Sequence, residues 1–331
     1  MRLSGRERTL VDRFQRGFPI VPRPYAEVAR ALAATEDDVL AMLRAAVESG
    51  VVSRVGPIFR AGSVGASTLA AMSVPRERLA DVARIVSAHE GVNHNYAREH
   101  RFNLWFVAHA HDGDALDALL RAIERDTRVP VCSLPLVREY HIDLGFALDG
   151  ANVKRPPAVD TAVRVQDEEA RRVACALECG LPLEPRPYAA IAKRAGLRSD
   201  DGEARVRAYL QRWLDQGVVK RLGIIVRHRT LGYTANVMAV WEIPGRDVDA
   251  IGARLAREPA VTLCYRRAPA PPAWRYNLFC MLHGRSRAPV NGEVDAIVAR
   301  HALAGYPHAR LFSIAAYKQV GARHDAPAVA G

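Results

Sequence analysis

The chain has 331 residues, of which 49% are hydrophobic and 25% charged, a balance typical of a globular protein rather than a disordered one. Its formal net charge of +11 favours a polyanionic partner: nucleic acid, an anionic membrane, or a small ligand rich in carboxylates. No apolar signal core begins the sequence, and no run reaches the roughly 18 apolar residues of a membrane span. With five scattered cysteines, typical of reduced thiols, we expect a cytoplasmic protein with no membrane partner.

Residues 1–62 follow the pattern of a winged helix-turn-helix. Apolar side chains recur at helical spacing in three stretches, and Pro24 suits the first turn of the second helix. Thr35, with Asp38 three residues on, predicts a capping box at the start of the third helix. The apolar run 51–55 then begins a strand. Three helices followed by such a strand predict the winged-helix unit.

Residues 63–148 change period and predict an α+β domain. Strands are expected at 68–74, 92–98, 102–110 and 131–142, with helices at 78–89 and 114–125. This βαββαβ order is typical of a ferredoxin-like antiparallel sheet with both helices on one face.

The whole plan then repeats. Residues 216–227 match 49–60 at seven of twelve positions, and Arg23-Pro24-Tyr25 recurs as Arg186-Pro187-Tyr188. We therefore predict a linker at 149–165, a second winged helix at 166–229, a second ferredoxin-like domain at 230–321, and a flexible tail at 322–331. The fold class is α+β, a tandem repeat of a winged helix plus a βαββαβ domain.

One stretch of the first half concentrates reactive side chains. Residues 94–101 hold two histidines, a tyrosine and two arginines: His94, Tyr96, Arg98, His100 and Arg101. The second-half copy keeps the tyrosine, the arginines and an Asn-Leu pair, with Leu263 at the position of His94 and Trp274 at that of His100. A repeated framework with histidines on one side only predicts a shared fold with one specialised site.

This stretch, with the strings at 227–241, 264–267 and 276–284, resembles the siroheme decarboxylase family, whose architecture is similar to that of Lrp/AsnC transcription factors. The resemblance covers nearly the whole chain and indicates the fused form, with two homologous subunits on one polypeptide. It implies removal of CO2 from two acetates of siroheme, giving 12,18-didecarboxysiroheme for heme d1 or, elsewhere, heme b. It implies no organic cofactor and no metal site beyond the iron of the substrate. It also implies that the two lobes form a pseudo-dimer, and leaves open a homodimer of fused chains.

The chemistry of this substrate selects the candidate residues. Siroheme carries eight carboxylates, which arginine matches in bidentate geometry. Loss of CO2 leaves electron density on a methylene carbon, and a histidine can protonate it. We therefore assign catalysis to His94 and His100. The predicted substrate-binding residues are Tyr96, Arg98, Arg101, Asn103, Trp105, Arg54, Arg60, Arg266, Arg267 and Lys318.

Strand alternation predicts which way these side chains point. In the strand at 102–110, Phe102, Leu104 and Phe106 should face the helices, and Asn103 and Trp105 the other face, where a partner lobe and the pocket are expected. Each assignment has an ordinary alternative. A histidine in a hairpin is often only solvated or capping, and Trp105 suits an apolar interface as well as a porphyrin platform.

Two other functions compete with decarboxylation. A DNA-binding regulator needs a basic recognition helix, but residues 36–48 carry a formal charge of −3, which repels a duplex. The second-half helix at 203–215 has three arginines against two acids, and one such module without a matching partner binds poorly. We therefore expect no specific DNA partner. A heme sensor without turnover would share the same pocket.

Overall fold

The computed structural model describes residues 5–60, 62–142, 163–165, 167–197, 200–226 and 235–319. These residues form two compact units that cut across the sequence repeat. The helical unit holds both winged-helix copies, and the sheet unit holds both βαββαβ copies. Most of the predicted linker and all of the predicted tail lie outside the described residues. No helix of the described ranges is long and apolar enough to cross a membrane.

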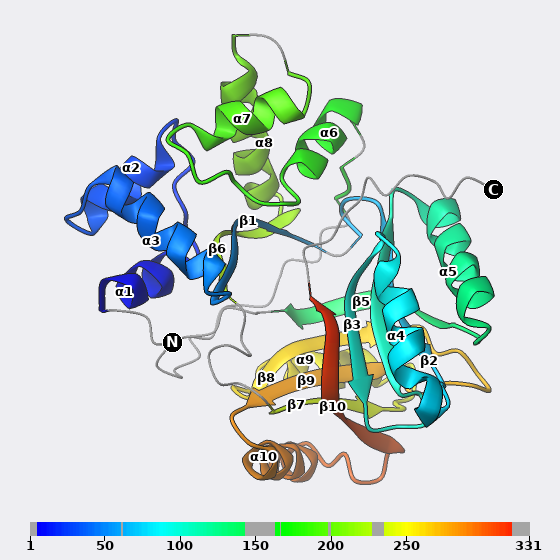
Figure 1. Ribbon diagram of the computed structural model, residues 1–331. Helices are drawn as coiled ribbons and strands as arrows, with labels where there is room; N and C mark the ends of the chain where they lie inside the picture. The colour runs from blue at the N-terminus through cyan, green and yellow to red at the C-terminus, as the bar shows by residue number, and fades with distance from the viewer. Residues whose placement is uncertain are drawn as a thin grey trace. The chain divides into compact units, whose positions relative to one another are not determined.

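In the helical unit each half has three helices and one strand, as predicted (Figure 1). The predicted capping box is confirmed: the Thr35 hydroxyl accepts from the Asp38 amide at 3.1 Å, and the Asp38 carboxylate accepts from the Thr35 amide at 3.1 Å. The elements are α1 (Gly5–Phe14), α2 (Pro24–Ala31), α3 (Glu36–Glu48) and β1 (Val52–Phe59), then α6 (Glu168–Ala176), α7 (Pro187–Arg194), α8 (Gly202–Asp215) and β6 (Val219–Val226).

The two winged-helix copies of this unit are joined symmetrically. Strands β1 and β6 pair antiparallel. The buried Tyr25 hydroxyl donates to the carbonyl of Pro182 at 2.9 Å, and its counterpart Tyr188 donates to the carbonyl of Pro19 at 2.7 Å. Each copy thus satisfies a buried phenol of the other, so both belong to one folding unit.

In the sheet unit the predicted βαββαβ order is confirmed in both halves. The first half consists of β2 (Ala66–Met72), a 3-10 turn (Arg76–Arg78), α4 (Leu79–Ala88), β3 (Val92–Arg98), β4 (Leu104–Ala110), α5 (Gly113–Thr127) and β5 (Cys132–Ile142). The second half consists of β7 (Ala235–Trp241), α9 (Val248–Leu255), β8 (Val261–Arg267), β9 (Leu278–Gly284), α10 (Arg287–Arg300) and β10 (His308–Gln319).

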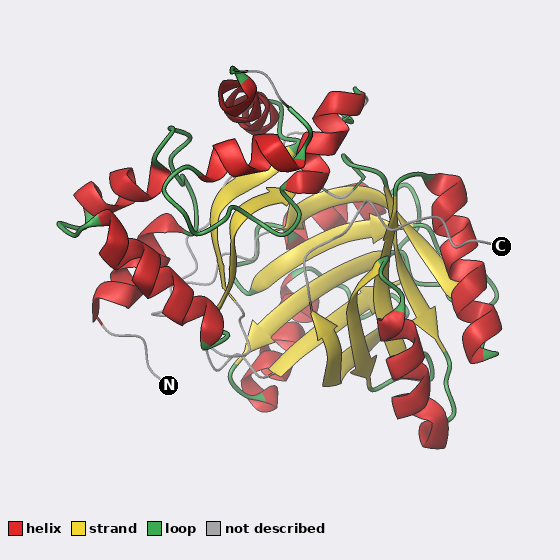
Figure 2. Ribbon diagram, turned by 45° about the horizontal axis from the view of Figure 1, so that its top comes forward, coloured by secondary structure: helices red, strands yellow, loops and turns green. Residues whose placement is uncertain are grey.

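The two halves exchange strand edges. The eight strands close in the order β10-β3-β4-β2-β5-β8-β9-β7. Strand β5 pairs with β2 of its own half and with β8 of the other, while β10 pairs with β7 and with β3. The strands of both halves, drawn in yellow in Figure 2, therefore form one closed sheet. Main-chain hydrogen bonds join the halves at both seams and leave no free sheet edge there.

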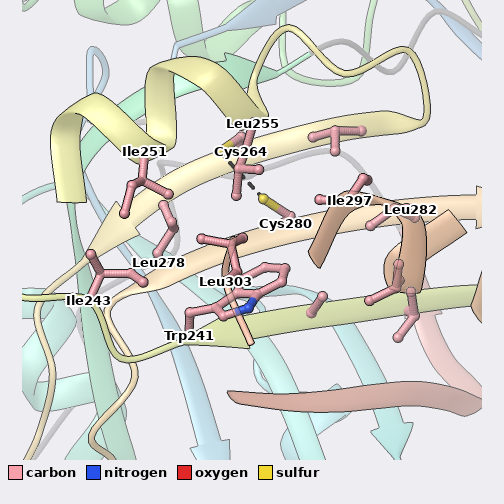
Figure 3. Packing of buried hydrophobic residues seen from close by; sticks show 14 of the residues in the cluster. Trp241, Ile243, Ile251, Leu255, Cys264, Leu278, Cys280, Leu282, Ile297 and Leu303 are labelled. Carbon is pink, nitrogen blue, oxygen red and sulfur yellow. Dashed lines mark hydrogen bonds between the residues drawn. The ribbon is translucent and has the colours of Figure 1, made fainter. Parts of the chain in front are cut away.

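Each half has its own apolar core between sheet and helices. In the first half, side chains such as Val82 of α4 and Ile123 of α5 pack on Leu104 and Phe106. Figure 3 shows the second-half core, where Trp241 lies among leucines and isoleucines and the sulfurs of Cys264 and Cys280 are 3.5 Å apart. A third cluster fills the opposite sheet face with residues of both halves: Phe102, Trp105, Leu134, Tyr265, Trp274, Phe279 and Leu311 among others.

These clusters test the predicted strand alternation. Leu104 and Phe106 face the helices and Trp105 faces the other half, as predicted. The prediction for Phe102 was wrong, because Phe102 packs with Trp105 on the far face. Strand β4 begins only at Leu104, so Phe102 belongs to the hairpin turn, where the two-residue period does not hold.

Candidate active site

Strand β3 points three of the candidate residues to the face away from the helices. Asn95 bonds toward α4, its amide donating to the carbonyl of Ala83 at 3.0 Å. His94 and Tyr96 therefore project the other way, with ring centroids 6.1 Å apart, and the Arg98 guanidinium lies 5.8 Å from the Tyr96 ring. These three side chains therefore share one face of β3.

Arg98 connects the two halves of the sheet unit through hydrogen bonds. It is 6% exposed and donates to the carbonyl of Leu311 at 3.0 Å and to the Asn236 side chain at 3.2 Å. Its counterpart Arg267 donates to the carbonyl of Leu134 at 2.7 Å, which is the same bond with the halves exchanged. A bond kept in both halves serves the fold, and a carboxylate-binding role of Arg98 stays a prediction.

His100 lies in the hairpin loop between β3 and β4, as predicted. Its Nδ1 accepts a hydrogen bond from the Phe102 amide at 3.0 Å, so the proton of the neutral ring is on Nε2. Its ring meets Trp274 of the second half edge-on, with centroids 5.4 Å apart. Burial, and then the charge of Arg101, lower the pKa of His100. The imidazole is therefore neutral at neutral pH, and protonation requires the Nδ1 bond to break.

The two candidate histidines occupy different places. His94 lies within β3, while His100 follows its end at Arg98. At about 3.3 Å per residue, the strand alone separates His94 from Arg98 by roughly 13 Å. Their contacts differ too, since His94 meets Tyr96 and His100 meets Trp274. The two imidazoles therefore have different surroundings.

Asn103 has a structural role, and its predicted substrate-binding role stays a prediction. Its side chain accepts from the Val74 amide at 2.9 Å and donates to the Val74 carbonyl at 2.8 Å. In the second half Asn277 makes the same two bonds with Ile243, at 2.9 and 2.8 Å. The oxygen and the nitrogen of the Asn103 side chain therefore both hold the hairpin against the segment that follows β2.

Replacing Asn103 by alanine should therefore lower the free energy of unfolding by about 1–3 kcal/mol, since two backbone groups of Val74 lose their partner. The Asn277 to alanine variant is the matched control and should lose a similar amount. Urea unfolding of both variants measures this. A binding defect for tetrapyrrole in Asn103→Ala without loss of stability would show that the amide contacts ligand.

Lys318 also contacts the backbone of the first half. Its ammonium donates to the carbonyls of Ser87 and His89 at 2.7 and 3.0 Å, at the end of α4, and its predicted substrate-binding role stays a prediction. In the sheet Lys318 is paired with Asn95, which faces α4. The lysine thus lies on the helix face, opposite to Tyr96, and stabilises the carbonyl end of a helix.

The remaining candidate residues of the sheet unit differ in their burial and in their contacts. Arg266 lies 3.5 Å from Asp249 of α9, on the helix face, and its predicted contact with substrate stays a prediction. Trp105 is 1% exposed and donates to the carbonyl of Phe102 at 2.7 Å, so it is interface core. Arg101 is exposed and donates to the carbonyl of Ala273 at 2.9 Å.

Arg54 and Arg60 belong to the helical unit. Arg60 donates to the carbonyl of Gly217 at 3.0 Å. Burial lowers the pKa of Arg54. Its second-half counterpart Arg221 donates to the carbonyl of Gln15 at 2.6 Å, a structural use of the same position. Binding roles for Arg54 and Arg60 stay predictions.

The candidate face is more open in the first half than in the second. Tyr96 is half-buried and is paired with Ala316, whereas its counterpart Tyr265 is 7% exposed and is paired with Glu139. His94 is half-buried as well. Among the described residues, the first half therefore places a half-buried imidazole and a half-buried phenol beside a small residue, and Tyr265 of the second half is more buried.

Two contacts of the histidine loop were missed by sequence reasoning. Trp274 was matched to His100 by position in the repeat, but it also touches His100 in space. Arg287 of α10 pairs with Glu99, the residue before His100. Both contacts join the halves across more than 170 positions (174 and 188), and no local pattern signals them.

The two winged-helix copies and the closed sheet of two βαββαβ halves match models of known protein families. A family model described as the AsnC-like ligand binding domain matches residues 63–141 and 230–318, and one described as the siroheme decarboxylase NirDL-like HTH domain matches residues 7–52.

The particular family follows from full-length relatives. The chain is 42% identical over 326 residues to the siroheme decarboxylase NirDL subunit of Paracoccus denitrificans, covering 97% of this chain and 98% of the relative. A crystal structure of the siroheme decarboxylase NirDL matches with a TM-score of 0.69 and 27% identity, over 97% of this chain and 94% of that one. Its co-complex with an iron-uroporphyrin III analogue matches with a TM-score of 0.68 and 26% identity, over 96% and 93%. The chain belongs to the siroheme decarboxylase family.

Proposed function

We propose that this protein is a siroheme decarboxylase, which removes CO2 from two acetate side chains of siroheme and leaves two methyl groups. The observation that carries the proposal is full-length similarity to the Paracoccus relative, whose name states this activity. The open first-half face with His94, Tyr96 and His100 near it supports the proposal. Each acetate loses CO2, its methylene carbon keeps the bonding electron pair, and one proton completes the methyl group.

The separation of the histidines assigns them different tasks. Each can donate a proton to a different acetate of one bound macrocycle, because roughly 13 Å of strand lies between His94 and Arg98. A general acid contributes roughly 10²–10⁴-fold to such a step. For His100 the proton must come from a ring whose pKa burial has lowered, which makes it a stronger acid once charged.

The other residues bind the substrate or keep water out of the site. Arg101 offers an exposed guanidinium beside His100 for one of the substrate carboxylates, and the Tyr96 hydroxyl can donate to another. The second half acts as the other lobe of a pseudo-dimer, which closes the sheet around the first-half face. The iron belongs to the substrate, and we propose no organic cofactor.

The test is anaerobic incubation of the purified chain with siroheme, followed by mass spectrometry of the extracted tetrapyrrole. Two successive losses of about 44 Da, one for each CO2, are expected. Tight binding with an unchanged substrate mass would instead support a heme sensor without turnover.

We also propose that the winged helices do not bind DNA specifically. Helix α3 begins with three acids, and Glu36 is held by Arg23. Like charge repels the phosphate backbone, so a gel-shift screen of genomic fragments at about 150 mM salt should show no sequence-specific complex. A nanomolar, sequence-specific complex would restore the regulator function.

A further inference from the structure

The loop that carries His100 is held by the second half through Glu99. Arg287, at the start of α10, donates from Nη1 to Oε1 of Glu99 at 2.6 Å, and a second bond joins Nη2 to Oε2. The guanidinium also lies 4.1 Å from the centroid of the Phe312 ring. A forked pair stacked on an aromatic ring has one preferred geometry, unlike a lone ammonium contact.

The described residues of the second half contain no counterpart of this ion pair at the matching loop position. The Glu99 amide donates to the carbonyl of Phe312 at 2.9 Å, and the matching bond in the second half runs from Ala268 to Pro135 at 3.0 Å. The main-chain bond therefore occurs in both halves. Ala268, however, has no carboxylate, so this ion pair is specific to the loop with the histidine.

The ion pair is poorly suited to a stabilising role. The side chains of Arg287 and Glu99 are 59% and 40% exposed. Pairs this exposed contribute little to stability, because water screens them. The geometry carries the argument instead: the forked pair stacked on Phe312 fixes the direction of the Glu99 side chain, next to His100.

We propose that Arg287 is a positioning residue of the first-half site, which holds the loop of Glu99 and His100 in the orientation that presents the imidazole to substrate. The inference rests on the proposed decarboxylase function. Arg287 does not touch the reacting atoms and acts through Glu99. The edge-on ring of Trp274, also from the second half, supports the imidazole from another side.

The experiment compares Arg287→Ala and Glu99→Gln with the reversed pair, Glu99→Arg with Arg287→Glu. Each single variant should lower kcat by about 10- to 10²-fold, because misplacing a catalytic group by about 1 Å has effects of this order. Binding of iron-uroporphyrin III, measured by its absorbance shift, should stay within about 2-fold of the wild type, and the reversed pair should recover most of the rate. Nitrogen NMR of the His100 ring should show one well-defined signal set in the wild type and averaged signals in Arg287→Ala.

Arg300→Ala is the matched control, since Arg300 lies on the same helix and pairs with Glu258 far from the loop. It removes an ion pair of α10 and should leave kcat unchanged. Equal rate losses in Arg287→Ala and Arg300→Ala, or a wild-type rate in Arg287→Ala, would overturn the proposal. A wild-type protein without decarboxylation refutes the proposed function instead, and the NMR comparison then still decides whether Arg287 orders the loop.

Discussion

Replacing His100 or His94 by alanine is expected to slow CO2 release by roughly 10²–10⁴-fold, the contribution of a general acid. Alanine cannot protonate the carbon that CO2 leaves, and neither Leu263 nor Trp274 at the second-half positions can take over. Substrate binding should remain measurable, because Arg101 is untouched. Single-turnover CO2 release, with matched titrations of bound tetrapyrrole, measures both effects.

The pH dependence of the same reaction follows from the His100 environment. Burial and Arg101 hold the pKa of His100 below its ordinary value of 6.5. The charged, proton-donating ring is therefore populated only at lower pH, and the rate should rise as pH falls through this depressed pKa. His100→Ala should lose this limb. Because of the same shift, the folded chain binds a proton at His100 less tightly than the unfolded chain does. The stability that the neutral His100 ring contributes is therefore lost as pH falls below 6.5.

His283→Ala is the control for the choice of half. His283 lies on β9 and its Nδ1 is 2.8 Å from the Thr262 hydroxyl, within the second half. Its removal should leave the rate close to that of the wild type. Near-normal rates in both first-half histidine variants, together with an inactive His283→Ala, would move the site to the second half.

Replacing Arg98 by alanine should lower the free energy of unfolding by about 3 kcal/mol or more. A hydrogen bond from a charged group contributes about 1.5–3 kcal/mol, and Arg98 donates to both the Leu311 carbonyl and Asn236 from a position that is 6% exposed. The variant leaves these acceptors buried and without this donor. Urea unfolding followed by circular dichroism measures the loss.

Arg101→Ala separates binding from folding. Arg101 is exposed, so its removal should leave stability nearly unchanged and should weaken the binding of iron-uroporphyrin III if it contacts a ligand carboxylate. An Arg98→Ala protein that unfolds like the wild type, but no longer binds tetrapyrrole, would contradict the structural role and return Arg98 to the binding site.

The local elements were predictable because each half repeats a clear hydrophobic period. Thr35 with Asp38 predicted a helix start, and alternation placed Leu104, Phe106 and Trp105 on the correct faces. The exchange of strand edges was not predictable in detail, because the partners β5 with β8 and β10 with β3 come from distant parts of the chain. Pairing of this kind is set by tertiary contacts rather than by local pattern.

The positions of the candidate side chains have specific causes. Strand β10 has two irregularities, between Ser313 and Ala315 and between Ala316 and Lys318, and Lys318 is paired with Asn95, on the helix side. Arg266 and Arg267 are neighbours on one strand, so alternation alone could have excluded one of them from the shared face. The double use of the Asn103 amide depends on Val74, 29 positions away, and had no local signal.

The most direct test of the central claim is decarboxylation of siroheme in deuterated water. The proposed reaction breaks the bond between methylene and carboxylate and gives each new methyl group one hydron from a solvent-exchanged acid. Mass spectrometry should therefore show the loss of two CO2 and the gain of one deuterium per new methyl. An unchanged siroheme mass would contradict the decarboxylase function. Loss of CO2 without deuterium in the methyl groups would contradict protonation by His94 and His100.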